Sequence, residues 1–200
     1  MARKPIKRRK LNTVIKIICE GRTEYLYFEE IRQSLKGSEI KIDPKISDNS
    51  SCIGVVKFAE KNYSDLSEDI KVFCIFDKDK NTKKNYEKAI KIAKKNKFEI
   101  VLSNPCFEVW FFAHYCDVFK LISTSKLQDE MKKKLGENFK TSRHNYEKLK
   151  INTQKAINNA KFFAKRNEND NLDKFSEEGN PSSDIYKVIE YIQEKSKKQL

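Results

Sequence analysis

Three acidic residues directly follow two apolar runs of the sequence, at the points where strands would end. Glu20 follows the run TVIKIIC, and Asp77 and Asp79 follow the run KVFCIF. Because the carboxyl ends of parallel strands share one edge of a sheet, where ligands bind, these carboxylates should face a common point. Mg²⁺ and Mn²⁺ prefer such oxygen ligands, and Mg²⁺ keeps waters that a phosphate can displace. The spacing predicts a metal site held by Glu20, Asp77 and Asp79.

Helix capping is the competing interpretation of the same acids. A carboxylate just before a helix accepts hydrogen bonds from the first N–H groups, so one acid at a strand end needs no metal. Three acids after two strands exceed that requirement, and we favour the metal site. Glu24, one helical turn beyond Glu20, and Glu108, in the first turn of a later helix, are weaker candidates for the same cleft. The helix dipole alone explains an acid at either position.

Other catalytic and nucleotide-binding patterns are missing from the sequence. It has five glycines and neither a GxxxxGK[ST] nor a GxGxxG run, which excludes a P-loop and a dinucleotide site. Of the two histidines, His114 falls in an apolar segment and is interpreted as a core residue, and His144 as a surface residue. The five cysteines form no CxxC pair, and no run approaches the roughly 18 apolar residues of a membrane span. We expect reduced thiols in a cytoplasmic protein.

Apolar runs of strand type alternate with helical periodicities over the first part of the chain. We expect strands over residues 13–19, 41–46, 71–76 and 98–102. We expect helices from Glu24 with Thr23 as N-cap, over 52–62, after Thr82, and over 106–115 behind Asn104-Pro105. This alternation predicts an α/β fold with a mainly parallel sheet flanked by helices.

Beyond Ser123 the pattern is helical, with a polar break over residues 167–179 and a last helix after Pro181. We therefore predict three parts in the chain. These are a basic flexible arm over 1–10, an α/β core over 11–120, and a helical C-terminal extension over 121–200 that packs on the core.

The chain carries a large excess of positive charge. Its 42 Lys and Arg against 29 Asp and Glu give a formal net charge of +13. Such a charge attracts polyanions, of which nucleic acid is the commonest. The arm and the Lys-rich helix after Thr82 would contact phosphates and read little sequence. The alternative is that the lysines only solvate the surface.

Several motifs resemble a known family. A Glu-Gly pair after the first strand and an Asp-x-Asp after a later strand resemble the Toprim pattern of topoisomerases, primases and some nucleases. More narrowly, the sequence resembles the RloB-like group, which is encoded near restriction systems and associated with phage defence. Four segments carry this resemblance: CEGRTEYLYFEEI over 19–31, FDKD over 76–79, SNPCFEVWF over 103–111 and NPSS over 180–183.

The resemblance implies a Toprim-like fold and Mg²⁺-dependent cleavage of phosphodiester bonds in RNA, tRNA included, or in DNA. Glu20 would be a metal ligand or general base, and Asp77 and Asp79 would hold the ion. Glu24 and Glu108 would line the same cleft. Related Toprim defence systems work with an ATPase, and this sequence has no ATP motif, so such a partner would be a separate protein.

One position departs from the resemblance. Many Toprim sites have a further acid two residues beyond the Asp-x-Asp, where this sequence has Asn81. The departure leaves a second reading open, in which the protein is a non-catalytic, metal-stabilised module that binds nucleic acid or regulates a partner.

Overall fold

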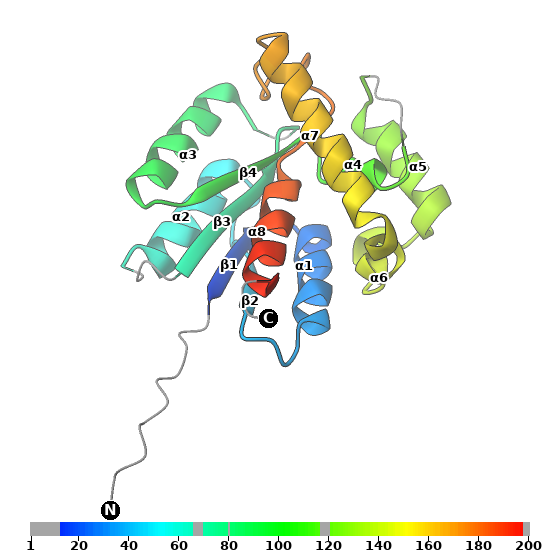
Figure 1. Cartoon of the computed structure of the whole chain (residues 1–200). Coiled ribbons are helices and arrows are strands. Elements are labelled where there is room, and N and C mark those ends of the chain that lie inside the picture. The colour runs from blue at the N-terminus through cyan, green and yellow to red at the C-terminus, as the bar shows by residue number, and fades with distance from the viewer. Residues whose placement is uncertain (1–12, 66–69, 80, 117–120, 198–200) are drawn as a thin grey trace, which may run out of the picture.

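Five strands form one sheet with helices on both faces (Figure 1). The computed structural model describes residues 13–65, 70–79, 81–116 and 121–197, so the arm predicted over 1–10 lies outside the described residues. The sheet order is β2-β1-β3-β4-β5, with the first four strands parallel and β5 antiparallel to β4. The strands are β1 (Val14–Cys19), β2 (Lys41–Ile46), β3 (Ile70–Asp77), β4 (Glu99–Asn104) and β5 (Ser182–Ser183). The predicted α/β fold with a mainly parallel sheet is confirmed.

Alternating side chains of the central strands build two separate cores. Ile15 and Ile17 point to the face covered by α1 (Arg22–Ser34) and α8 (Ile185–Lys197). Ile18 points to the opposite face, which α2 (Cys52–Tyr63) and α3 (Lys83–Lys95) cover. Because both faces are buried, the strands are continuous apolar runs, as parallel strands usually are.

Two predicted helix starts are confirmed by their caps. The Ser51 hydroxyl accepts a hydrogen bond from the Gly54 N–H at 3.1 Å, and the Thr82 hydroxyl accepts one from the Asn85 N–H at 3.3 Å. The prediction that Thr23 caps α1 was wrong, because that helix already begins at Arg22 behind Gly21. The Thr23 hydroxyl instead donates to the Lys140 carbonyl at 3.3 Å.

The helix expected over 106–115 is shorter than predicted. It is α4 (Glu108–Ala113), and Pro105 therefore lies before it rather than in its first turn. Asn104 is the last residue of β4, and the Pro105 carbonyl accepts a hydrogen bond from the Asp79 N–H at 3.1 Å. This link to the loop after β3 holds Pro105 outside the helix.

The C-terminal segment is helical, as predicted, but it also adds a strand and part of the core. Its helices are α5 (Thr124–Leu135), α6 (Asn145–Leu149), α7 (Thr153–Asn169) and α8, with short 3-10 turns η1 (Phe139–Thr141) and η2 (Lys150–Asn152). β5 was not predicted. Ile185 and Val188 of α8 are buried in the same cluster as Ile15 and Ile17, and the boundary at residue 120 stays a prediction. Across the described part of the chain, no helix combines the length and the apolarity that crossing a membrane requires.

Truncating α8 at its buried face should destabilise the whole protein. Ile185 is 0% exposed and Ile151 is 87% exposed, so the same substitution at these two sites isolates the effect of burial. We expect Ile185→Ala to lower the free energy of unfolding by about 2–5 kcal/mol, and Ile151→Ala to change it by less than about 0.5 kcal/mol. Urea denaturation measures both. Equal stability of the two variants would contradict the shared core.

Candidate functional site

A hollow of about 180 Å³ opens at the carboxyl edge of the sheet, and all five acids singled out in the sequence line it. Glu20 follows β1, Asp77 ends β3 and Asp79 lies in the loop beyond. Glu24 and Glu108 come from the first turns of α1 and α4. The structure therefore brings together the side chains that the strand ends predicted to be neighbours. Their roles as ligands or catalysts stay predictions.

The pairing of β1 with β3 sets the closest contact between these acids. Cys19 pairs with Ile75, so the residues that follow, Glu20 and Phe76, continue side by side. A Glu20 carboxylate oxygen, Oε2, accepts a hydrogen bond from the Asp77 N–H at 3.0 Å. Glu20 is buried, and this bond to the backbone fixes the orientation of its carboxylate.

Asp77 is the least satisfied acid of the group. Its Oδ1 is buried, and no residue in the described part of the chain donates a hydrogen bond to it. Burial first, and then the nearby carboxylates of Glu24, Glu20, Glu108 and Asp79, raise the pKa of Asp77 well above its ordinary value. A buried oxygen without a partner is costly, and a proton or a cation would remove that cost.

Asn81 has a structural role beside the site. Its side-chain amide donates to the Asp77 carbonyl at 2.6 Å, and its Oδ1 accepts a hydrogen bond from the Cys52 N–H at 2.9 Å. It thereby ties the end of β3 to the start of α2. A carboxylate here would keep the second bond and lose the first, because it cannot donate. Both hydrogen bonds of Asn81 therefore require an amide at this position.

The residues of the hollow fit a loosely held hard cation. Carboxylates crowd together, and the Asp77 oxygen lacks a partner. However, no group of three or more Asp, Glu, His or Cys residues among those described is arranged to hold a metal ion as it stands. A closed zinc-type cage therefore does not fit. Mg²⁺, which takes one or two carboxylates and completes its shell with water, does.

Side chains that can donate hydrogen bonds line the hollow together with the acids, and the sequence did not single them out. Lys140 of η1 places its ammonium nitrogen 3.1 Å from a Glu108 carboxylate oxygen, Oε1. Arg22, Thr124 and Gln128 also line the hollow. Lys140 is one of 42 basic residues and lies 32 residues beyond Glu108 in the sequence, so no local pattern marks it.

Neither cysteine nor histidine supplies a nucleophile or base here. Cys106 lines the hollow, but burial, together with Glu108 and Asp77, raises the pKa of its thiol, which stays protonated. His114 is buried in the core as expected, and burial lowers its pKa to about 4. Its Nδ1 lies 2.8 Å from the Trp110 carbonyl oxygen, and its Nε2 has no partner among the described residues. His144 is exposed, as predicted. The carboxylates are the largest set of titratable groups in the lining.

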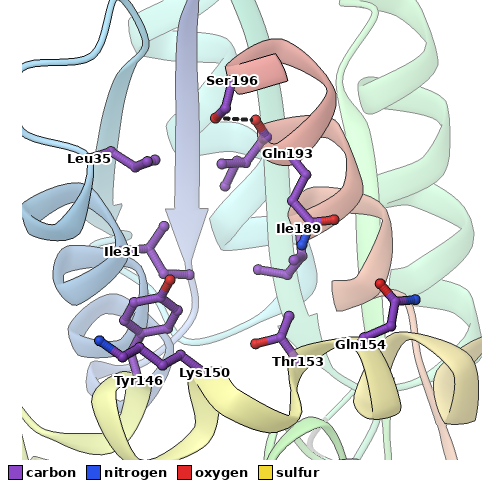
Figure 2. A pocket seen from close by; sticks show the side chains of 10 residues that line it. Ile31, Leu35, Tyr146, Lys150, Thr153, Gln154, Ile189, Gln193 and Ser196 are labelled. Atoms are coloured by element: carbon purple, nitrogen blue, oxygen red, sulfur yellow. Dashed lines mark hydrogen bonds between the residues drawn. The ribbon is translucent and has the colours of Figure 1, made fainter. Parts of the chain in front are cut away.

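A second hollow, of about 340 Å³, lies between α1, α6, α7 and α8 (Figure 2). Ile31 and Ile189 form apolar walls, and the polar side chains of Tyr146 and Gln193 also line it. Its lining contains no Asp, Glu, His or Cys. Lys150 and Tyr146 are the titratable groups of this lining, which lacks the cluster of carboxylates found at the sheet edge, so we take the acidic hollow as the candidate active site.

Neutralising Asp77 should change how stability depends on pH. Its folded pKa is raised, so wild type has a stabilising contribution below the unfolded pKa of about 3.9 and loses it as pH rises through the folded pKa. Asp77→Asn cannot lose a proton, so its free energy of unfolding should exceed that of wild type at neutral pH, and the gap should close toward about pH 4. Urea denaturation across this range, with a chelator present, measures the difference.

The exposed acid Asp129 of α5 provides the matched control for that series. Asp129→Asn removes the same charge from a solvated site, and its stability should follow wild type at each pH. If the free energy of unfolding of Asp77→Asn also matched that of wild type at each pH, the buried carboxylates would not be repelling one another.

Comparison with known proteins gives one match. The model of the RloB-like protein family matches residues 15–192, which include all five acids, Lys140 and β5. No curated protein and no solved structure gives a significant match. Because the matched residues span most of the chain, the protein belongs to the RloB-like protein family.

Proposed function

We propose that this protein is a Mg²⁺-dependent nuclease that cleaves phosphodiester bonds of RNA or DNA and acts as an effector of phage defence. The observation that carries the proposal is the buried Asp77 oxygen without a partner, in a hollow lined by four further carboxylates. A bound cation would supply that partner and offset the repulsion among the acids. The nuclease class and the defence role come from the Toprim and RloB-like resemblance of the motifs.

Glu20, Asp77 and Asp79 would hold the ion, and Mn²⁺ suits the same oxygens. When bound, the ion would supply a Lewis acid that activates a water and stabilises charge on the phosphate. Glu20 was expected as a ligand or a general base. The hydrogen bond from the Asp77 N–H orients its carboxylate, which suits a ligand and a positioned general base alike. Glu24 and Glu108 complete the negative lining.

An exposed basic stripe supports a nucleic-acid substrate. Lys84, Lys88 and Lys91 lie on one face of α3 and are exposed. Their spacing offers several phosphate contacts without reading bases. By contrast, Lys83 and Lys95 of the same helix are paired with Asp173 and Glu60, at 2.9 and 3.7 Å.

A second function is favoured by two observations. Asn81 replaces a further acid, and the described residues contain no preformed group of three ligands. Both suit a non-catalytic Toprim-like module that binds nucleic acid or regulates a separate ATPase partner. Cleavage distinguishes the two functions, because such a module would retain nucleic acid and leave it intact.

Mg²⁺ should stabilise the wild-type protein and support cleavage, and both effects should depend on the acids. We expect Mg²⁺ to raise the unfolding midpoint of wild type because it binds the folded state. Asp77→Asn and Glu20→Gln should lose most of that rise and all cleavage of a tRNA pool and of plasmid DNA. Asp129→Asn should keep both. Thermal unfolding and gel electrophoresis, each with Mg²⁺ or a chelator, are the measurements.

Each result bears on a different claim. Full cleavage by Asp77→Asn would rule out the catalytic assignment. An unfolding midpoint of wild type that is the same with and without Mg²⁺ would rule out the metal site. Retention of intact tRNA or plasmid by the Mg²⁺-loaded wild type would favour the non-catalytic module.

Binding of nucleic acid should weaken steeply with salt if lysines contact phosphates. Each contact to a single strand contributes about −0.7 to the slope of log affinity against log salt. Changing Lys84, Lys88 and Lys91 together to Gln should make the slope shallower, and so should deletion of residues 1–10. Fluorescence anisotropy with a labelled RNA measures the slope, and the unfolding midpoint checks the fold. A slope near zero in wild type would show that the lysines only solvate the surface.

A further inference from the structure

Lys140 lines the hollow and contacts one of its acids. Its ammonium nitrogen lies 3.1 Å from Glu108 Oε1, and its side chain is 47% exposed whereas that of Glu108 is 5% exposed. The carboxylate is therefore buried and the ammonium reaches it from the solvent side. This asymmetry separates Lys140 from an ordinary surface ion pair, in which both partners are solvated.

The backbone around Lys140 is fixed while its side chain remains half exposed. The Lys140 carbonyl accepts a hydrogen bond from the Thr23 hydroxyl at 3.3 Å, which joins η1 to the first turn of α1. The preceding residue, Phe139, is buried, and its carbonyl accepts a bond from the Asn145 side chain at 2.6 Å. Asn145 is held in turn by Glu30 of α1, whose carboxylate accepts its N–H at 3.2 Å. A fixed backbone with a long, flexible side chain lets the ammonium turn without moving the loop.

The surroundings of Lys140 are those of a phosphate-binding site. Arg22, Thr124 and Gln128 line the same hollow, so donors and carboxylates are neighbours there. A phosphate bound to a cation at Glu20, Asp77 and Asp79 would have further oxygens that such donors could contact. A compact ammonium with three N–H donors suits an oxygen of tetrahedral phosphate.

We propose that Lys140 is a substrate-binding residue whose ammonium leaves Glu108 to contact a phosphate oxygen of the nucleic acid at the acidic hollow. This proposal rests on the proposed nuclease function and names a residue of the C-terminal segment as part of its site. In the free protein Lys140 offsets one of the crowded negative charges. A cation held by Glu20, Asp77 and Asp79 would offset negative charge in the same hollow and would repel the ammonium of Lys140, which would weaken its pairing with Glu108. No covalent bond forms or breaks in this exchange.

The test compares Lys140→Met with Lys140→Arg and with Lys36→Met, an exposed lysine in the turn between α1 and β2. Binding of a labelled single-stranded RNA is measured against salt with Ca²⁺ in place of Mg²⁺, so that the acids of the hollow stay intact and can hold a cation of less strict geometry while the probe survives. Lys140→Met should make the slope of log affinity against log salt shallower by about 0.7, the contribution of one phosphate contact. Lys140→Arg should keep a slope close to that of wild type, because the charge remains. Lys36→Met should have the wild-type slope.

Kinetics in the otherwise wild-type protein provide the second readout. Lys140→Met should lower kcat/KM roughly 10- to 100-fold, as expected for loss of one bond between charged groups, while Mg²⁺ still raises its unfolding midpoint. Lys36→Met should cleave like wild type. If Lys140→Met lowers the midpoint without Mg²⁺, Lys140→Gln, which keeps a donor, takes its place.

The outcomes separate the two proposals. If wild type binds and cleaves RNA but Lys140→Met matches Lys36→Met in slope and kcat/KM, the role of Lys140 is overturned and the nuclease stands. If Lys140→Met loses the Mg²⁺ effect on unfolding with an unchanged slope, Lys140 acts through Glu108 and does not bind substrate. If wild type neither binds nor cleaves nucleic acid, both proposals fail.

Discussion

The parallel pairing of β1 with β3 is the constraint on which the site depends. It aligns Cys19 with Ile75 and so places Glu20 where its carboxylate accepts the Asp77 N–H. Both strands are buried on their two faces, so their register cannot shift by one residue without exchanging the two cores. The positions of the acids are thus set by apolar packing deep in the sheet, and the hollow inherits the rigidity of that packing.

The same packing forces an electrostatic compromise at the sheet edge. The packed strands and helices hold carboxylates close together although they repel one another. Burial and these neighbouring charges together raise the pKa of Asp77. Lys140 offsets part of the charge from outside, through Glu108. The fold therefore tolerates an unfavourable cluster at one point because the remaining core is well packed, which is typical of a site kept for a ligand.

Local signals in the sequence were sufficient to predict the parallel strands and the proximity of the acids that follow them. Apolar runs such as KVFCIF predicted the strands, and the rule that parallel strands share a carboxyl edge predicted that Glu20 and Asp77 would meet. The parts that were missed depend on distant residues. Thr23 contacts Lys140 across 117 positions of sequence, and Asn104 ends β4 with its side-chain amide donating to the Lys174 and Ser176 carbonyls. β5 has two residues, which is too short for any periodicity.

The late position of α8 in the chain has a consequence for how the protein is made. Ile185 and Val188 cover the sheet face formed by Ile15 and Ile17, which leave the ribosome long before them. Until residues 185–192 emerge, α1 covers part of that face and the area that α8 covers in the folded protein is exposed on the growing chain, where it can associate with chaperones or with other nascent chains. The α8 side of this sheet face is therefore covered only after all the residues that line the acidic hollow have been synthesised.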